Sequence, residues 1–170
     1  MVTAISTHPE RVQGNGDMHM GSSLVKIDVH IIFHLKTTSP RLEPDDFERI
    51  WLYIGGIIRN IGGVVIQIGS GSDHIHILSS GPKNMSIVDF VWTIKIESSK
   101  WIKTIDDRYQ SFAWQNGYGA FSVSSSVIPN AMEYIKNQQE HHRIKTFAEE
   151  YLEFLNANGM EYDERYIYND

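Results

Sequence analysis

The sequence contains no cysteine among its 170 residues. This absence excludes disulfides, thiolate metal sites and cysteine nucleophiles, so any chemistry has to come from oxygen and nitrogen groups. The chain also lacks an apolar run of the roughly 20 residues that span a bilayer, and it lacks the basic and apolar segments of a secretory signal. We therefore expect a cytoplasmic protein with one folded unit, large enough to bury a core without disulfides or a structural metal.

An excess of positive charge is also missing, because the formal net charge is −6. Residues 147–170 contain seven acidic residues and one basic residue, Arg165, so this segment carries the whole net charge. The rest of the chain is neutral overall, and groups of basic residues there are more often solvated faces than binding sites. Phosphate contacts usually supply much of the affinity for DNA. The charge distribution therefore permits DNA binding without favouring it.

The chain divides into three parts by pattern. Residues 1–19 have neither the period of a strand nor that of a helix, and we expect a disordered N-terminal extension, with Met20 as a candidate native start. Residues 20–146 contain the periodic segments and form the expected domain. Residues 147–170 form the expected acidic C-terminal helix and tail.

Hydrophobic periodicity predicts the elements of the domain. Every odd position from Val25 to Leu35 is apolar, which is typical of a half-buried strand. The other segments read in the same way are a helix over 44–61, strands over 64–68 and 74–78, a helix from 86 to about 105, a hairpin or a strand plus loop over 112–123, a helix over 130–143, and a helix from 146 to 158. The order β-α-β-β-α-β predicts an α+β fold of the ferredoxin-like split βαβ type, an antiparallel sheet with helices on one face and with appended C-terminal helices.

Two histidines flank one isoleucine in the segment Asp73-His74-Ile75-His76. Alternation along a strand directs His74 and His76 to the same face, where two imidazoles can converge on one divalent cation. The spacing by itself is weak, and a structural or exposed histidine pair is the more common interpretation.

A second pair lies on the predicted helix over 130–143. Tyr134 and Gln138 are four residues apart and therefore share one helical face, with the tyrosine hydroxyl near whatever the glutamine binds. Alone, this pair is more often a half-buried aromatic residue and a surface polar residue.

Together, and in this order, the His-x-His strand and the later Tyr-Ile-x-Asn-Gln helix resemble the single-tyrosine HUH transposases. The resemblance extends from about Met20 into the tail and is strongest for the insertion-sequence and REP-associated tyrosine transposases. Further segments that resemble the family are 29–33, 98–101, 112–121 and 140–142.

The resemblance implies an HUH-endonuclease fold in which His74, His76 and Gln138 bind Mg²⁺ or Mn²⁺ and Tyr134 is the nucleophile. Imidazole suits Mn²⁺ better than Mg²⁺, which prefers oxygen ligands. The implied reaction is nicking and joining of single-stranded DNA hairpins through a 5′-phosphotyrosine, on chromosomal or element DNA. The resemblance favours a homodimer and leaves a monomer open.

Candidate DNA contacts are basic and aromatic side chains in the second half of the domain, because aromatic rings can stack on unpaired bases. For the tryptophans a place in the core is the competing interpretation, and for Trp101 it is the favoured one. His30 and His34 lie on the polar side of the first strand, and that side could adjoin the metal face. Exposed strand histidines are the favoured interpretation of both. The candidates are Lys95, Lys100, Lys103, Trp101, Trp114 and Tyr118.

Two other functions stay open at this point. A catalytically idle DNA-hairpin-binding protein derived from a transposase would not need Tyr134. An unrelated metallohydrolase would use the two histidines with water and form no covalent intermediate. The intact set of Tyr134, His74, His76 and Gln138 favours the nicking and joining enzyme.

Overall fold

The computed structural model describes residues 24–138 and 146–162. Within these residues, six elements form the β-α-β-β-α-β unit that the sequence predicts, and two further helices follow it. The main elements are β1 (Asp28–His34), α1 (Phe47–Asn60), β2 (Val64–Ser70), β3 (His74–Ser80), α2 (Ile87–Ile105), β4 (Gly119–Ser122), α3 (Ile128–Lys136) and α5 (Phe147–Ala157). Short 3₁₀ turns lie before α1 and after α2, η1 (Pro44–Asp46) and η2 (Asp107–Tyr109) respectively.

The four strands form one antiparallel sheet in the order β2-β3-β1-β4. This is the strand order of the split βαβ arrangement, with β1 and β3 at the centre of the sheet. The α+β fold class predicted from the sequence is confirmed.

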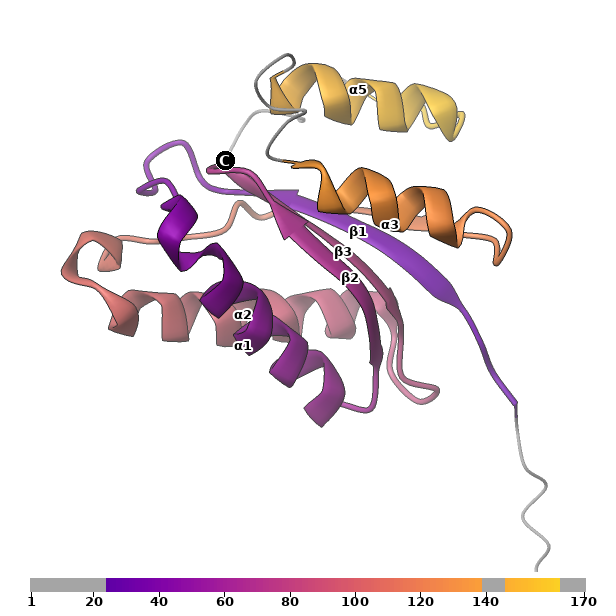
Figure 1. Ribbon diagram of the computed structural model, residues 1–170, viewed down its shortest axis with the longest axis horizontal. Helices are drawn as coiled ribbons and strands as arrows, with labels where there is room; N and C mark the ends of the chain where they lie inside the picture. The colour runs from indigo at the N-terminus through magenta and orange to yellow at the C-terminus, as the bar shows by residue number, and fades with distance from the viewer. Residues whose placement is uncertain (1–23, 139–145, 163–170) are drawn as a thin grey trace, which may run out of the picture.

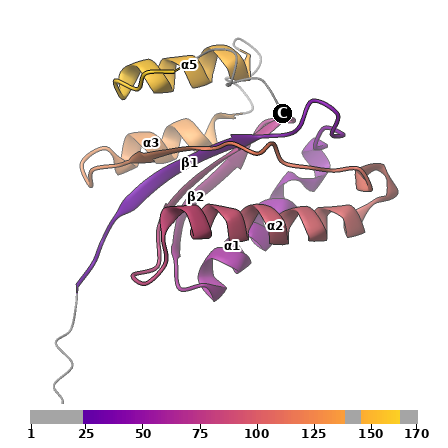
Figure 2. The same ribbon diagram turned by 180° about the vertical axis from the view of Figure 1, so that it is seen from behind.

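Helices cover both faces of the sheet. In Figures 1 and 2, α1 and α2 of the split βαβ unit lie on one face, while α3 and α5 lie on the other. The prediction of helices on one face thus describes the βαβ unit, and the appended helices cover the second face. The two faces have different side chains because residues alternate along each strand.

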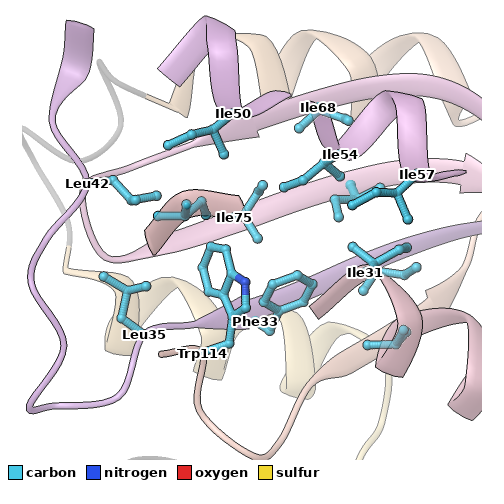
Figure 3. Packing of buried hydrophobic residues seen from close by; sticks show 14 of the residues in the cluster. Ile31, Phe33, Leu35, Leu42, Ile50, Ile54, Ile57, Ile68, Ile75 and Trp114 are labelled. Atoms are coloured by element: carbon cyan, nitrogen blue, oxygen red, sulfur yellow. The ribbon is translucent and has the colours of Figure 1, made fainter. Parts of the chain in front are cut away.

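The main hydrophobic core lies between the sheet and the pair α1 and α2. Odd-numbered residues of β1, such as Ile31 and Phe33, point into it and meet Ile54 of α1 and Ile94 of α2. Figure 3 shows this packing, with Trp114 beside Phe33. Burial of these side chains removes apolar surface from water, which is the main force holding the two helices on the sheet.

Local signals in the sequence set the ends of several helices. Ser86 accepts a hydrogen bond from the Asp89 amide at the start of α2, and Thr146 with Glu149 forms a capping box at the start of α5. Gly62 follows α1 with a φ of 85°, a conformation that glycine adopts at little cost. These ends agree with those predicted from the sequence.

Two segments differ from the simplest prediction. Residues 112–114 do not pair with β4 as a hairpin, because Trp114 forms an isolated bridge with Leu35 instead. The helix predicted over 130–143 is described as α3 up to Lys136, and residues 139–145 lie outside the described part. The predicted extension over 1–19 and most of the predicted tail also lie outside it. Among the described helices, none is long and apolar enough to cross a membrane.

Candidate active site

Histidines cluster on the sheet face that α3 and α5 cover. On β3, Ile75 and Ile77 point into the main core, so His74 and His76 point to the opposite face. The register pairs Ile32 of β1 with His76, and the even-numbered residues of β1, including His30, share this second face. Both His74 and His76 are completely buried. The predicted convergence of two imidazoles on one face is thus present in the structure.

The ring of His74 is held between two polar groups. Its Nδ1 lies 2.8 Å from Oδ1 of Asp73, and its Nε2 lies 3.3 Å from Oε1 of Gln138. A proton on Nδ1 would be donated to the aspartate and would leave Nε2 as a lone-pair donor. Carboxylates commonly orient metal-binding histidines in this way.

The ring of His76 is held in a similar way by another histidine. Nε2 of His30 lies 2.9 Å from Nδ1 of His76, and Nε2 of His76 lies 3.4 Å from Oε1 of Glu150. His30 is only 3% exposed, so its interpretation as an exposed strand histidine is wrong. Helix α5 covers it, and this cover cannot be read from the alternation of β1. Burial lowers the pKa of His30 from 6.5 to about 4, so the imidazole stays neutral near pH 7.

Helix α3 carries Tyr134 to the same place. Gly69 on β2 permits this packing, because a Cβ at that position would lie 2.2 Å from the carbonyl oxygen of Ile135. The Tyr134 ring lies edge-on to His76, with ring centroids 5.9 Å apart, and it also contacts Phe154 of α5. The predicted nucleophile, both predicted ligand histidines and Gln138 therefore come together at one site.

Glu150 is a site residue that sequence reasoning missed. It belongs to α5, is 4% exposed, and its Oε1 accepts a hydrogen bond of 3.0 Å from Nε2 of Gln138. Burial, with smaller contributions from Glu153 and Asp73, raises the pKa of Glu150 from 4.5 to about 7. In the sequence, this residue is one of several acids in the predicted C-terminal helix and tail, where a carboxylate is normally solvated. Only the position of α5 in the fold distinguishes Glu150 from these other acids.

The donor set fits a divalent cation. One ligand atom each from His74, His76 and Glu150 lies within 4.8 Å of the other two, and all three residues are buried. The Oε1 of Gln138 is at hydrogen-bond distance from His74. Neutral imidazoles combined with carboxylate or amide oxygen suit first-row divalent ions such as Mn²⁺, and the set contains no thiolate that would select softer metals.

The candidate DNA contacts lie on the opposite face of the sheet, along α2 and the segment 113–118. A cavity of about 470 Å³ opens between these two parts and is lined by Lys95, Lys100 and Tyr118 among others. Trp92, which sequence reasoning did not select, also lines it and is 63% exposed. Lys103 lies one turn further along α2 and is exposed.

Two of these candidates have structural partners. Trp114 is 5% exposed and packs edge-on against Phe33, so it is a core residue, and its Nε1 donates to Ser98. The Nζ of Lys95 donates to the carbonyls of Asn116 and Gly117. Burial lowers the pKa of Lys95 from 10.5 to about 8.

Trp101 and His34 are each partly buried against aromatic rings. Trp101 stacks on Tyr53, with ring centroids 4.1 Å apart, and packs against the main core. This agrees with the interpretation of Trp101 as a core residue, which the sequence favoured. The ring of His34 packs against Phe147 of α5.

Comparison with known families agrees with this arrangement. Residues 23–138 match the family model described as "Transposase IS200 like". The match covers more than half of the chain and includes His74, His76, Tyr134 and Gln138. The chain belongs to the IS200-like transposase family. No curated protein matches this transposase.

Two solved structures share the fold of this IS200-like transposase. One is a protein of Deinococcus radiodurans R1 that is provisionally named a transposase, with a TM-score of 0.53 and 20% identity over 69% of this chain and 94% of that one. The other is a REP-associated tyrosine transposase bound to a REP hairpin, with a TM-score of 0.50 and 12% identity over 68% of each chain. Both likenesses concern the fold.

Proposed function

We propose that this transposase nicks and joins single-stranded DNA hairpins with Tyr134 as its nucleophile. The observation that carries the proposal is the position of Tyr134, whose ring lies against His76 of the buried His74 and His76 pair. A tyrosine beside two histidines that can bind a metal offers the nucleophile and the ion site that metal-assisted covalent cleavage of a phosphodiester needs.

His74, His76 and Gln138 would hold a divalent metal ion, Mn²⁺ or Mg²⁺. When bound, such an ion neutralises charge on the non-bridging oxygens of the scissile phosphate and orients it. The protein fixes the two imidazoles by the contacts of His74 with Asp73 and of His76 with His30. Because each ring is held at Nδ1, each Nε2 is directed into the site.

The reaction consists of two exchanges at phosphorus. The hydroxyl oxygen of Tyr134 forms a bond to phosphorus as it loses its proton, and the bond from phosphorus to the 3′-oxygen breaks. A 5′-phosphotyrosine and a 3′-hydroxyl result. A different 3′-hydroxyl can then attack the phosphotyrosine and release Tyr134, so strands are joined without an external energy source.

The proposed DNA partner is a hairpin with unpaired bases. The similar REP-associated transposase is named as bound to a REP hairpin, and the cavity beside α2 combines Lys95 and Lys100 with the rings of Trp92 and Tyr118. Aromatic faces stack on unpaired bases, and lysines attract the backbone. The exposed Lys100 and Lys103 are the candidates for phosphate contacts, whereas the buried Trp114 supports the wall of the cavity.

Two further properties remain predictions. We expect a homodimer, and sedimentation velocity of the purified chain would distinguish it from a monomer. We also expect the protein to act in the cytoplasm, on chromosomal or element DNA.

A denaturing gel tests the proposal. Purified protein is mixed with Mn²⁺ or Mg²⁺ and with end-labelled hairpins from the DNA that flanks its own gene, and a covalent protein–DNA adduct is expected. The adduct should disappear with chelator and in Tyr134→Phe, while Tyr53→Phe, a matched change on the other face of the sheet, should leave it. Hairpin binding without an adduct would support an idle binding protein, and cleavage without an adduct would support a water-using hydrolase.

A further inference from the structure

Helix α5 lies directly over the candidate site, beside α3 in both ribbon views (Figures 1 and 2). Its residues Phe147, Glu150, Tyr151 and Phe154 follow the spacing i, i+3, i+4, i+7 and therefore share one face of the helix. Three of them are aromatic and contact the sheet face that carries the histidines. This is the face by which α5 docks.

The aromatic contacts surround the histidines closely. Phe147 stacks on His74 with ring centroids 4.8 Å apart, and Phe154 packs edge-on against His30 at 5.0 Å. Docking also uses Gly119 of β4, where a Cβ would come within 2.9 Å of the Tyr151 hydroxyl. The position of α5 is thus fixed at both its first and later turns.

A carboxylate on this face is unfavourable for docking alone. Burying a charged group costs free energy unless it is paired or binds a metal, and an apolar residue at position 150 would complete an apolar face. Glu149 and Glu153, by contrast, are exposed or capping residues of the same helix. Glu150 is the acid that α5 directs into the site, where its Oε1 lies 3.4 Å from Nε2 of His76.

We infer that Glu150 is a ligand of the divalent metal ion, so that the ion joins helix α5 to strand β3. The inference rests on the proposed function, because it needs a metal at His74 and His76. A carboxylate adds a hard oxygen ligand, which improves the fit to Mn²⁺ or Mg²⁺. Gln138 then has a second role, since its Nε2 donates to Oε1 of Glu150 and orients the carboxylate.

Metal binding and docking of α5 are therefore linked. An ion that binds when α5 is docked stabilises the docked helix by mass action. Conversely, the docked helix supplies a ligand that raises the affinity for the ion. Glu150 lies outside residues 23–138, the part of the chain that matches the family model.

The test measures Mn²⁺ binding to the full chain without DNA, by isothermal calorimetry and by the electron paramagnetic resonance signal of free Mn²⁺. Glu150→Gln keeps the shape of the side chain but removes its charge, and the expected result is binding weakened at least about 10-fold, since even groups that only orient ligands change metal affinity by about 10- to 100-fold. Glu161→Gln, which changes an exposed acid beyond the end of the same helix, is the matched control and should bind Mn²⁺ as the unmodified chain does.

A second readout is hydrogen exchange, and its decisive measurement is made on the unmodified chain. In the unmodified chain, Mn²⁺ should slow hydrogen exchange of the amides over 147–157 by at least the fold-change seen at β3, and it should not do so in Glu150→Gln. Absence of this slowing in the unmodified chain, when Mn²⁺ binds, would overturn the inference even if the variant fails to fold.

The outcomes separate this inference from the proposed function. If the unmodified chain binds no Mn²⁺ and no Mg²⁺, the proposed metal site is wrong. If the unmodified chain and Glu150→Gln bind Mn²⁺ equally, the metal site stands and Glu150 is not a ligand. Weakened binding in Glu150→Gln, together with metal-dependent protection of α5 in the unmodified chain, supports both.

Discussion

Replacement of His30 by phenylalanine should weaken metal binding although His30 is not itself a proposed ligand. Nε2 of His30 lies 2.9 Å from Nδ1 of His76, and the hydrogen bond between the two rings fixes which nitrogen of His76 faces the site. Loss of such an orienting partner weakens metal affinity by about 10- to 100-fold, or about 1.4 to 2.8 kcal/mol. Phenylalanine keeps most of the volume, so the packing against Phe154 remains.

The same substitution should change how stability depends on pH. The pKa of His30 is lowered from 6.5 to about 4 in the folded protein, so the unfolded chain binds the proton more readily. The corresponding stability is present above pH 6.5 and is lost as the pH falls through 4, with about 2 kcal/mol lost by pH 5. In His30→Phe this part of the acid loss should be absent.

Calorimetric titration with Mn²⁺ checks the effect on metal affinity. Urea unfolding at pH 7 and at pH 5, with chelator at both pH values, checks the effect on stability. His30→Gln, which can restore a hydrogen bond to His76, should recover part of the Mn²⁺ affinity. Ile32→Val, a buried change on the same strand and face, should leave that affinity unchanged. Unaltered Mn²⁺ affinity in a folded His30→Phe protein would refute the role assigned to His30.

Other predictions concern the framework. Gly69→Ala should displace α3, since its Cβ would lie 2.2 Å from the Ile135 carbonyl oxygen, and it should reduce the yield of DNA adduct. Gly56→Ala has open space for its Cβ within helix α1. This variant should therefore raise the free energy of unfolding by about 0.5–1 kcal/mol, measured by urea unfolding. Ser98→Ala removes the acceptor of the Trp114 indole N–H and should cost about 1–3 kcal/mol by the same assay. An adduct yield unaffected by Gly69→Ala, or unchanged stability in Ser98→Ala, would contradict these assignments.

Local patterns predicted much of the fold. The alternation from Val25 to Leu35 predicted β1, and the capping residues Ser86 and Thr146 predicted where α2 and α5 begin. These features depend on neighbours in the sequence, so they can be recognised without tertiary information. The pairing of His74 with His76 on one face follows from the same alternation, whereas the roles of Tyr134 and Gln138 came from family resemblance.

The parts that could not be predicted depend on packing between distant segments. From the sequence alone, Glu150 is expected to be a solvated acid and His30 an exposed strand residue. Both are buried because α5 covers them. Trp114 is a similar case, because the sequence offers it as a DNA contact whereas its ring is buried in the core and its indole N–H donates to Ser98. No spacing within one segment contains this information.

The two-faced character of the central strands has a consequence for insertions and deletions. On β1 and β3, side chains for the core and for the site alternate residue by residue, so an insertion of one residue exchanges the two sets beyond it. Ile75 would then face the site and a histidine would face the core. Strand β3 should tolerate single-residue insertions far less than conservative substitutions, because alternate residues of the strand serve its two faces.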